Sequence, residues 1–270
     1  MKKEICFFVI IMSCLIGISA ITTTGSTTTS GTTTTAIATT TSIPPGGGST
    51  TSITTTTTTA SAAKVEILGG GFSNGLWHPV PQLPAVNRAL VFIAFAERSG
   101  PTTLNSVTYG GRPMTKIIQR NVGTTYAQNY VAAFILNDAG IAAATDDHFA
   151  VSWSGVPSEV EYGHVFLQNV NQSVLTGAKA SRATATGFPN PITTSALFTC
   201  NGDMVFAAAE CGNSGIYTMN NGFSRWFAYR LTSSSGAVGI KSATGAKETP
   251  SATFSGTLSR QAIIGFVVRH

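Results

Sequence analysis

Between residues 64 and 270 the apolar residues come in short runs rich in Val, Ile, Phe and Tyr, mostly bounded by Gly, Pro, Asn or Ser. This pattern constrains the fold more than any other feature, because such runs between turn residues are typical of strands. We find no convincing amphipathic helix, and only residues 139–145 predict a short helical turn. The candidate strands are 65–68, 89–96, 106–109, 114–119, 126–136, 148–153, 162–170, 192–199, 204–210, 224–231, 238–242, 252–254 and 262–269.

Turn signals separate these runs. The pairs Asn201-Gly202 and Asn221-Gly222 suit the positive φ angles of tight hairpins. A glycine run at 69–71 predicts a flexible turn rather than a nucleotide-binding loop, since no helix follows it. About a dozen short strands without crossover helices predict an all-β fold, specifically an antiparallel β-sandwich that is jelly-roll-like.

The composition excludes several classes of protein. Hydrophobic residues make up 43% of the chain, which excludes a wholly disordered protein. Charged residues make up only 10%, against about 25% in average globular proteins, so a charge-laced helical protein is also excluded. The net charge of +5 is scattered without a basic stripe, and we therefore expect no nucleic-acid partner.

The first twenty residues are typical of a secretory signal. Lys2 and Lys3 precede a nearly apolar stretch at 5–16, and small residues follow at 17–20. The apolar stretch is short for a membrane span, so after cleavage we expect no spanning segment and a secreted or cell-surface protein. Two alternatives stay open: an uncleaved N-terminal anchor, and a lipid anchor on Cys14, because residues 11–14 loosely resemble a lipobox.

Residues 21–63 differ sharply from the rest of the chain. Of these 43 residues, 21 are Thr and 6 are Ser, none is charged or aromatic, and four isolated Ile are the only large apolar groups. Such a stretch buries too little surface to offset its ordering entropy. We therefore predict a disordered stalk or linker with local extension but no fold, which precedes a folded domain at 64–270.

Several segments of the folded part resemble a bacterial and phage-associated extracellular β-sandwich module. Residues 106–115 match its SVTYGG-x-x-MT hairpin, and residues 202–207 match its GDLVVA strand. Segments 133–137, 149–155, 166–172 and 262–266 are similar to further strands of that module. The resemblance implies a jelly-roll-like sandwich; it implies no catalytic motif.

No motif in the chain indicates an enzyme. There is no Gly-x-Ser-x-Gly elbow, no zinc-ligand spacing and no phosphate-binding loop, so we predict a protein without enzymatic activity and without a required cofactor. The densest ligand-like cluster is Asp146-Asp147-His148, which makes Asp146 and Asp147 weak candidates for a Ca²⁺ site. Asp138, Glu159 and Glu161 would join them only if their strands were adjacent. A solvated acidic turn is the simpler interpretation of Asp146 and Asp147.

Two cysteines, Cys200 and Cys211, lie in the folded part. An exported protein permits a disulfide between them. If 204–210 is one strand, however, the two residues lie about 25–35 Å apart at roughly 3.3 Å per residue, and a bridge needs Cα atoms within about 7 Å. We therefore favour two free thiols.

Aromatic residues supply the candidate binding surface. Trp77, Trp153, Trp226 and Tyr229, with Phe227, are candidates for stacking on sugar rings, although tryptophans of a sandwich also serve as core anchors. We predict an exported module for extracellular binding, adhesion or assembly, with a glycan or protein surface as partner. The alternatives are a lectin-like carbohydrate-binding domain and a subunit of a surface layer or filament, which would make homo-oligomers; a hydrolase would need converging catalytic groups.

Overall fold

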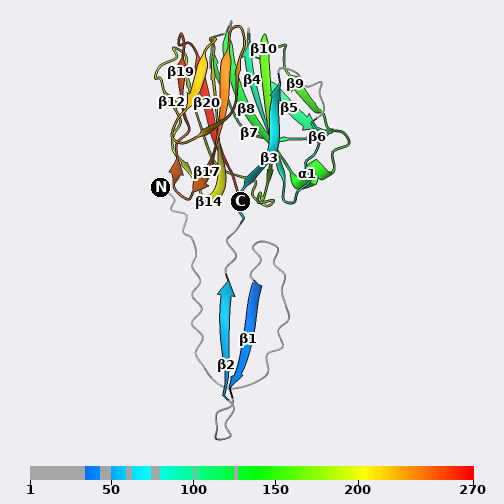
Figure 1. The fold of residues 1–270 in the computed structure, drawn as a ribbon. Coiled ribbons are helices and arrows are strands. Elements are labelled where there is room, and N and C mark those ends of the chain that lie inside the picture. Colours follow the sequence, from blue (N-terminus) through cyan, green and yellow to red (C-terminus); the bar gives the residue numbers. More distant parts are fainter. Residues whose placement is uncertain are drawn as a thin grey trace, which may run out of the picture. The chain divides into compact units, whose positions relative to one another are not determined.

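A computed structural model describes residues 34–42, 50–58, 63–73, 80–98, 100, 102–124 and 127–270 (Figure 1). The chain forms two compact units, Met1–Ser61 and Ala62–His270, and each is described by itself.

In the first unit, strand β1 (Thr34–Ser42) pairs with β2 (Thr50–Thr58) in antiparallel register, with Thr34 opposite Thr58. The composition predicted local extension without a fold, and the structure differs by pairing these two stretches. The β-branched side chain of threonine favours extended backbone, which explains why both stretches take strand conformation. The rest of the 21–62 region, and the predicted signal with Cys14, lie outside the described residues.

The regular secondary structure of the second unit is nearly all strand, and every strand pairing described in it is antiparallel. The predicted all-β class is therefore confirmed. The short helix α1 (Asp138–Ala142) lies where a helical turn was predicted, and the Asn137 side chain caps it by accepting a hydrogen bond from the Gly140 N–H (2.9 Å). The predicted turn at Asn221-Gly222 is confirmed, because these residues have φ angles of 54° and 77°. The prediction was wrong for Asn201-Gly202, because both residues belong to strand β14 (Asn201–Cys211).

Two five-stranded sheets form the centre of this unit. The strands of the first sheet, in spatial order, are β3 (Glu66–Ser73), β10 (Glu159–Gln168), β4 (Ala89–Arg98), β8 (Gln128–Asn137) and β7 (Thr115–Gly123). The strands of the second are β11 (Thr176–Thr184), β20 (Gln261–Val268), β14 (Asn201–Cys211), β17 (Ser235–Thr244) and β16 (Ser224–Arg230). Alternate side chains of both sheets meet in the main core, which includes Phe95, Phe206 and Phe266.

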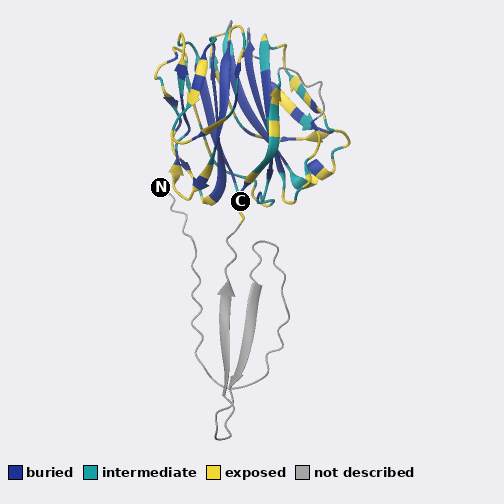
Figure 2. Ribbon diagram, in the orientation of Figure 1, coloured by how far each residue is buried: buried dark blue, intermediate teal, exposed yellow. Residues whose placement is uncertain are grey.

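Shorter strands cover the outer faces of both sheets. On the first sheet, α1 and the sheet of β6 (Arg112–Pro113), β5 (Leu104–Tyr109) and β9 (Phe149–Trp153) contribute to a second core. On the second sheet lie β12 (Ile192–Thr193), β19 (Ser251–Ser255) and β15 (Ile216–Met219), with the pair β13 (Leu197–Phe198) and β18 (Lys247–Glu248). Strands covered on both faces, such as β4 and β20, are buried at every residue (Figure 2).

The strands of the two central sheets come in the same order along the chain and across the sheet. In the first half the strands β3, β4, β7, β8 and β10 occupy the positions that β11, β14, β16, β17 and β20 occupy in the second half. The outer pair β5 and β9 corresponds in the same way to β15 and β19. The unit is therefore built from two halves of like topology, packed sheet against sheet. Across the sandwich β7 lies next to β11, and β3 lies next to β16, where Phe72 stacks on Phe227 at 5.4 Å.

Candidate functional site

Two of the aromatic residues predicted to offer stacking faces are buried. Tyr229 is only 7% exposed, and its hydroxyl donates a hydrogen bond to Oε1 of Glu210 at 3.1 Å. Phe227 is also buried. The prediction was wrong for both, because they occupy the positions of β16 that point between the two sheets into the main core.

Trp153 and Trp226 are the two tryptophans among the described residues. Both are half-buried, and they differ in what they contact. Trp153 packs edge-on against Tyr130 at 5.3 Å, and its Nε1–H donates to the Tyr162 hydroxyl at 2.9 Å, so its indole is tied into the outer core of the first sheet. Trp226 packs against the main core with part of its surface, and it also lines an open groove. Trp77 lies outside the described residues.

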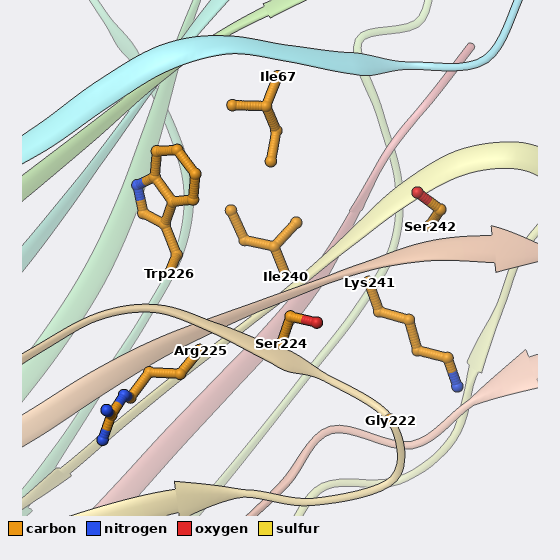
Figure 3. Close-up of a pocket in the computed structure, with 8 residues that line it drawn as sticks. All are labelled: Ile67, Gly222, Ser224, Arg225, Trp226, Ile240, Lys241 and Ser242. Atoms are coloured by element: carbon orange, nitrogen blue, oxygen red, sulfur yellow. The ribbon is translucent and has the colours of Figure 1, made fainter.

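The groove lies on the side of the sandwich between edge strands β3 and β16, and its volume is about 560 Å³. That volume is within the range of about 300–1,000 Å³ that is usual for small-molecule sites. Figure 3 shows Ile67 of β3 facing Ile240 of β17, with the Trp226 indole at one end of the space between them. The eight lining residues are Ile67, Gly222, Ser224, Arg225, Trp226, Ile240, Lys241 and Ser242.

Trp226 reaches this groove because of a β-bulge. Arg225 pairs with Gly239 and Phe227 with Val238, so Trp226 is the extra residue of the edge strand. A bulge redirects its extra side chain out of the normal alternation. The bulge lets Phe227 point into the core directly after Trp226, whose indole packs against the core and lines the groove.

The residues that line the groove include two cations, Arg225 and Lys241, and no anion. Ile67 and Ile240 provide an apolar floor, and the side chains of Ser224 and Ser242 add hydroxyl groups to it. Figure 3 shows the Lys241 side chain pointing away from this space. Lys241 forms an ion pair with Glu248 (2.7 Å) and donates to the Asn221 carbonyl (2.9 Å).

The glycine run of β3 pairs closely with β10. Gly69, Gly70 and Gly71 were predicted to form a flexible turn, but they lie within β3 and pair with Phe166, Val165 and His164 of β10. A Cβ on Gly70 would lie 2.2 Å from the His164 carbonyl oxygen, so this close pairing requires a residue without a side chain.

The corresponding side of the other half is bridged. There β11 takes the place of β3 and β7 takes the place of β16, and the Lys179 side chain crosses from β11 to donate to the Ile117 carbonyl at 3.0 Å. Ile117 is itself the extra residue of a bulge in β7, as Trp226 is in β16. The two sides therefore differ although the two halves have like topology: one side is bridged and the other is open.

The acidic cluster forms a solvent-facing turn. The Asp146 carboxylate accepts a hydrogen bond from the His148 backbone N–H (2.9 Å), and Asp147 contacts the His148 ring at 2.9 Å. Asp138 pairs with Arg88 (2.6 Å) instead of joining this cluster, and Glu159 accepts hydrogen bonds from the loop at 232–234. Within the described ranges no three His, Cys, Asp or Glu residues are placed to hold a metal ion.

Both cysteines of the folded unit are free thiols. Cys211 is the last residue of β14 and is buried, whereas Cys200 directly precedes that strand and is exposed. Burial raises the pKa of the Cys211 thiol to about 11, which makes it unreactive at neutral pH.

Sequence reasoning missed a group of buried polar residues between the two sheets. Arg260 joins the sheets by donating to Glu97 (2.9 Å) and to the Asn129 side chain (3.0 Å). Glu210 is 0% exposed, and burial raises its pKa well above the usual value despite the hydrogen bond from Tyr229. A sequence signal existed, since Glu97 and Glu210 are each the last residue but one of an apolar strand, at a position that alternation directs inward.

No family model, curated protein or solved structure matches this chain. Among the described residues, no helix is long and apolar enough to cross a membrane.

Proposed function

We propose that this chain is an extracellular binding module whose ligand occupies the groove beside Trp226. In this proposal a signal at residues 1–20 exports the protein. The Thr-rich segment at 21–63 then holds the binding domain away from its point of attachment.

The placement of Trp226 carries the proposal. Of the candidate aromatic residues that the structure describes, Tyr229 is buried and Trp153 is tied into a core by its ring and its Nε1–H. Trp226 alone among them lines an open groove. A large amphipathic ring beside an apolar floor and hydroxyl groups is the usual composition of a binding site.

The groove supports binding rather than catalysis. Its eight lining residues include two serines but no Asp, Glu or His that could activate a serine hydroxyl, and Lys241 is paired with Glu248 outside the groove. The buried carboxyl of Glu210 is fully enclosed, so a substrate has no access to it. We therefore favour a binding protein over a hydrolase.

Assembly into a layer or filament through strand pairing is the weaker candidate for this side of the molecule. Both edge strands are interrupted next to the groove, β3 at Leu68 and β16 at Trp226. Bulges disturb the ladder of backbone groups that another strand would need, and they are a common protection of sheet edges.

A binding assay on isolated envelopes of the producing cells tests the proposal. We expect Trp226→Ala to bind at least about tenfold more weakly than the parent protein, because the variant loses the ring that forms one end of the groove. Ile216→Ala is the matched control, since Ile216 is 54% exposed and does not line the groove. Far-ultraviolet circular dichroism checks that both variants are folded. Equal binding by Trp226→Ala and the parent would disprove the proposed site.

A further inference from the structure

We infer that the groove beside Trp226 binds a neutral pyranose ring of a glycan. This inference rests on the proposed function and adds the chemical class of the ligand. Three properties of the groove support it: the arrangement of its apolar surfaces, the outward direction of its two cationic side chains, and the interruption of both strands at its edges.

The apolar surfaces match the shape of a sugar ring. A pyranose has a C–H face that stacks on aromatic rings and a rim of hydroxyl groups that form hydrogen bonds. Trp226 supplies an aromatic surface, and Ile67 and Ile240 supply an apolar floor beside it (Figure 3). The Ser224 and Ser242 hydroxyls each offer one donor and two acceptor lone pairs to the hydroxyl groups of a sugar.

The charges at this side favour a neutral ligand. Lys241 is engaged outside the groove by Glu248 and by the Asn221 carbonyl, and Figure 3 shows the Arg225 side chain pointing away from the space between Ile67 and Ile240. An anionic group held between Ile67 and Ile240 would lose hydration while both cationic side chains point away from it, which is unfavourable. A neutral polyol has no such penalty.

A peptide added as a further strand fits this side less well. Such a peptide would need an uninterrupted row of backbone donors and acceptors along β3 or β16. The register of β3 shifts at Leu68, which lies between the paired residues Ile67 and Gly69. The register of β16 shifts at Trp226, which lies between the paired residues Arg225 and Phe227. These bulges lie beside the residues that line the groove, so regular pairing stops where the binding surface begins.

Two treatments of the envelopes distinguish a glycan from a protein ligand. Periodate oxidises the vicinal diols of sugars, and protease digestion removes proteins. We expect periodate to abolish the binding that depends on Trp226, and protease to leave it intact. We also expect saturable binding of the full chain to at least one polysaccharide from a panel of neutral glucan, mannan and galactan, with polygalacturonate as the acidic comparison.

Matched variants assign that binding to the ring. Trp226→Phe keeps an aromatic face and should retain binding within about threefold. Trp226→Leu keeps apolar packing but has no ring, and we expect binding at least about fivefold weaker, since aromatic stacking contributes about 1 kcal/mol or more and about 1.4 kcal/mol corresponds to tenfold. Ser242→Phe fills the groove from an exposed position and should also abolish binding while Trp226 stays in place.

The outcomes separate the inference from the proposed function. Trp226-dependent binding that resists periodate and is lost on protease treatment would overturn the sugar while leaving the proposed site intact. Binding to polygalacturonate alone would overturn the neutral class. Equal affinity of Trp226→Phe and Trp226→Leu would overturn ring stacking. Binding that none of the Trp226 variants alters would remove the proposed site itself.

Discussion

Glu161 makes a sharp test of how burial controls the stability of this sandwich. It lies on β10 opposite Phe95, at a position that points between the two sheets, and it is 5% exposed. Burial raises the pKa of the Glu161 carboxyl from 4.5 to about 7. The described residues give it no ion-pair partner that would favour the charged form.

The sign and size of the effect follow from proton linkage. The folded protein holds the proton of Glu161 more tightly than the unfolded chain does, so the free energy of unfolding falls as the pH rises from about 4.5 to about 7. At about 1.4 kcal/mol per pH unit, the loss is about 3 kcal/mol. Glutamine stays neutral at every pH, and Glu161→Gln should therefore remove this dependence.

Urea unfolding at pH 4, 6 and 8 measures the effect. We expect the free energy of unfolding of Glu161→Gln, relative to the parent, to increase by about 3 kcal/mol between pH 4 and pH 8. Any cost of burying the amide is the same at each pH and cancels in this comparison. Glu66→Gln removes an exposed carboxylate and controls for the change in net charge. A difference that stays constant, or that decreases with pH, would refute the reasoning.

Two further predictions concern the residues around β14. Burial alone would raise the pKa of Asp203, but hydrogen bonds from Cys200 and His270 and the charge of Arg269 lower it, so its contribution to stability is present above about pH 4 and is lost in acid. Asp203→Asn should therefore lower the free energy of unfolding at pH 7 by about 3–5 kcal/mol in a urea titration, and a loss under about 1 kcal/mol would contradict this. Iodoacetamide at pH 8 should label Cys200 and spare Cys211 in the folded protein, as read by peptide mass spectrometry; rapid labelling of both would show that Cys211 is accessible.

The sequence was sufficient to predict the strands that bury apolar side chains. The predicted run 89–96 lies within β4, and the run 204–210 lies within β14, because both are rich in β-branched, aromatic and small apolar residues. Strand β11 was missed because its sequence, TGAKASRAT, has no large apolar residue. It is an edge strand that pairs through its backbone with β20, and backbone pairing leaves no hydrophobic period in a sequence.

The candidate site was only partly predictable. Trp226 was among the predicted stacking residues, together with Tyr229, but the sequence could not distinguish which of them faces outward. The distinction depends on one bulge, which shifts the alternation between Arg225 and Phe227. The contribution of Ile67 to the groove could not be predicted either. Ile67 reaches the groove only because two segments distant in the chain come together as β3 and β16.

The unequal sides of the sandwich give a physical reason to place function at the groove. Where Lys179 bridges β11 and β7, a single side chain spans the edges of both sheets. On the corresponding side β3 carries glycines, and a half-buried Trp226 remains in contact with water. Burial of apolar surface stabilises a fold by about 25 cal/mol per Å². The part of the indole that stays hydrated does not contribute this free energy. Single exposed apolar side chains are common on folded proteins, and Trp226 differs from them because it lines a groove together with Ile67 and Ile240.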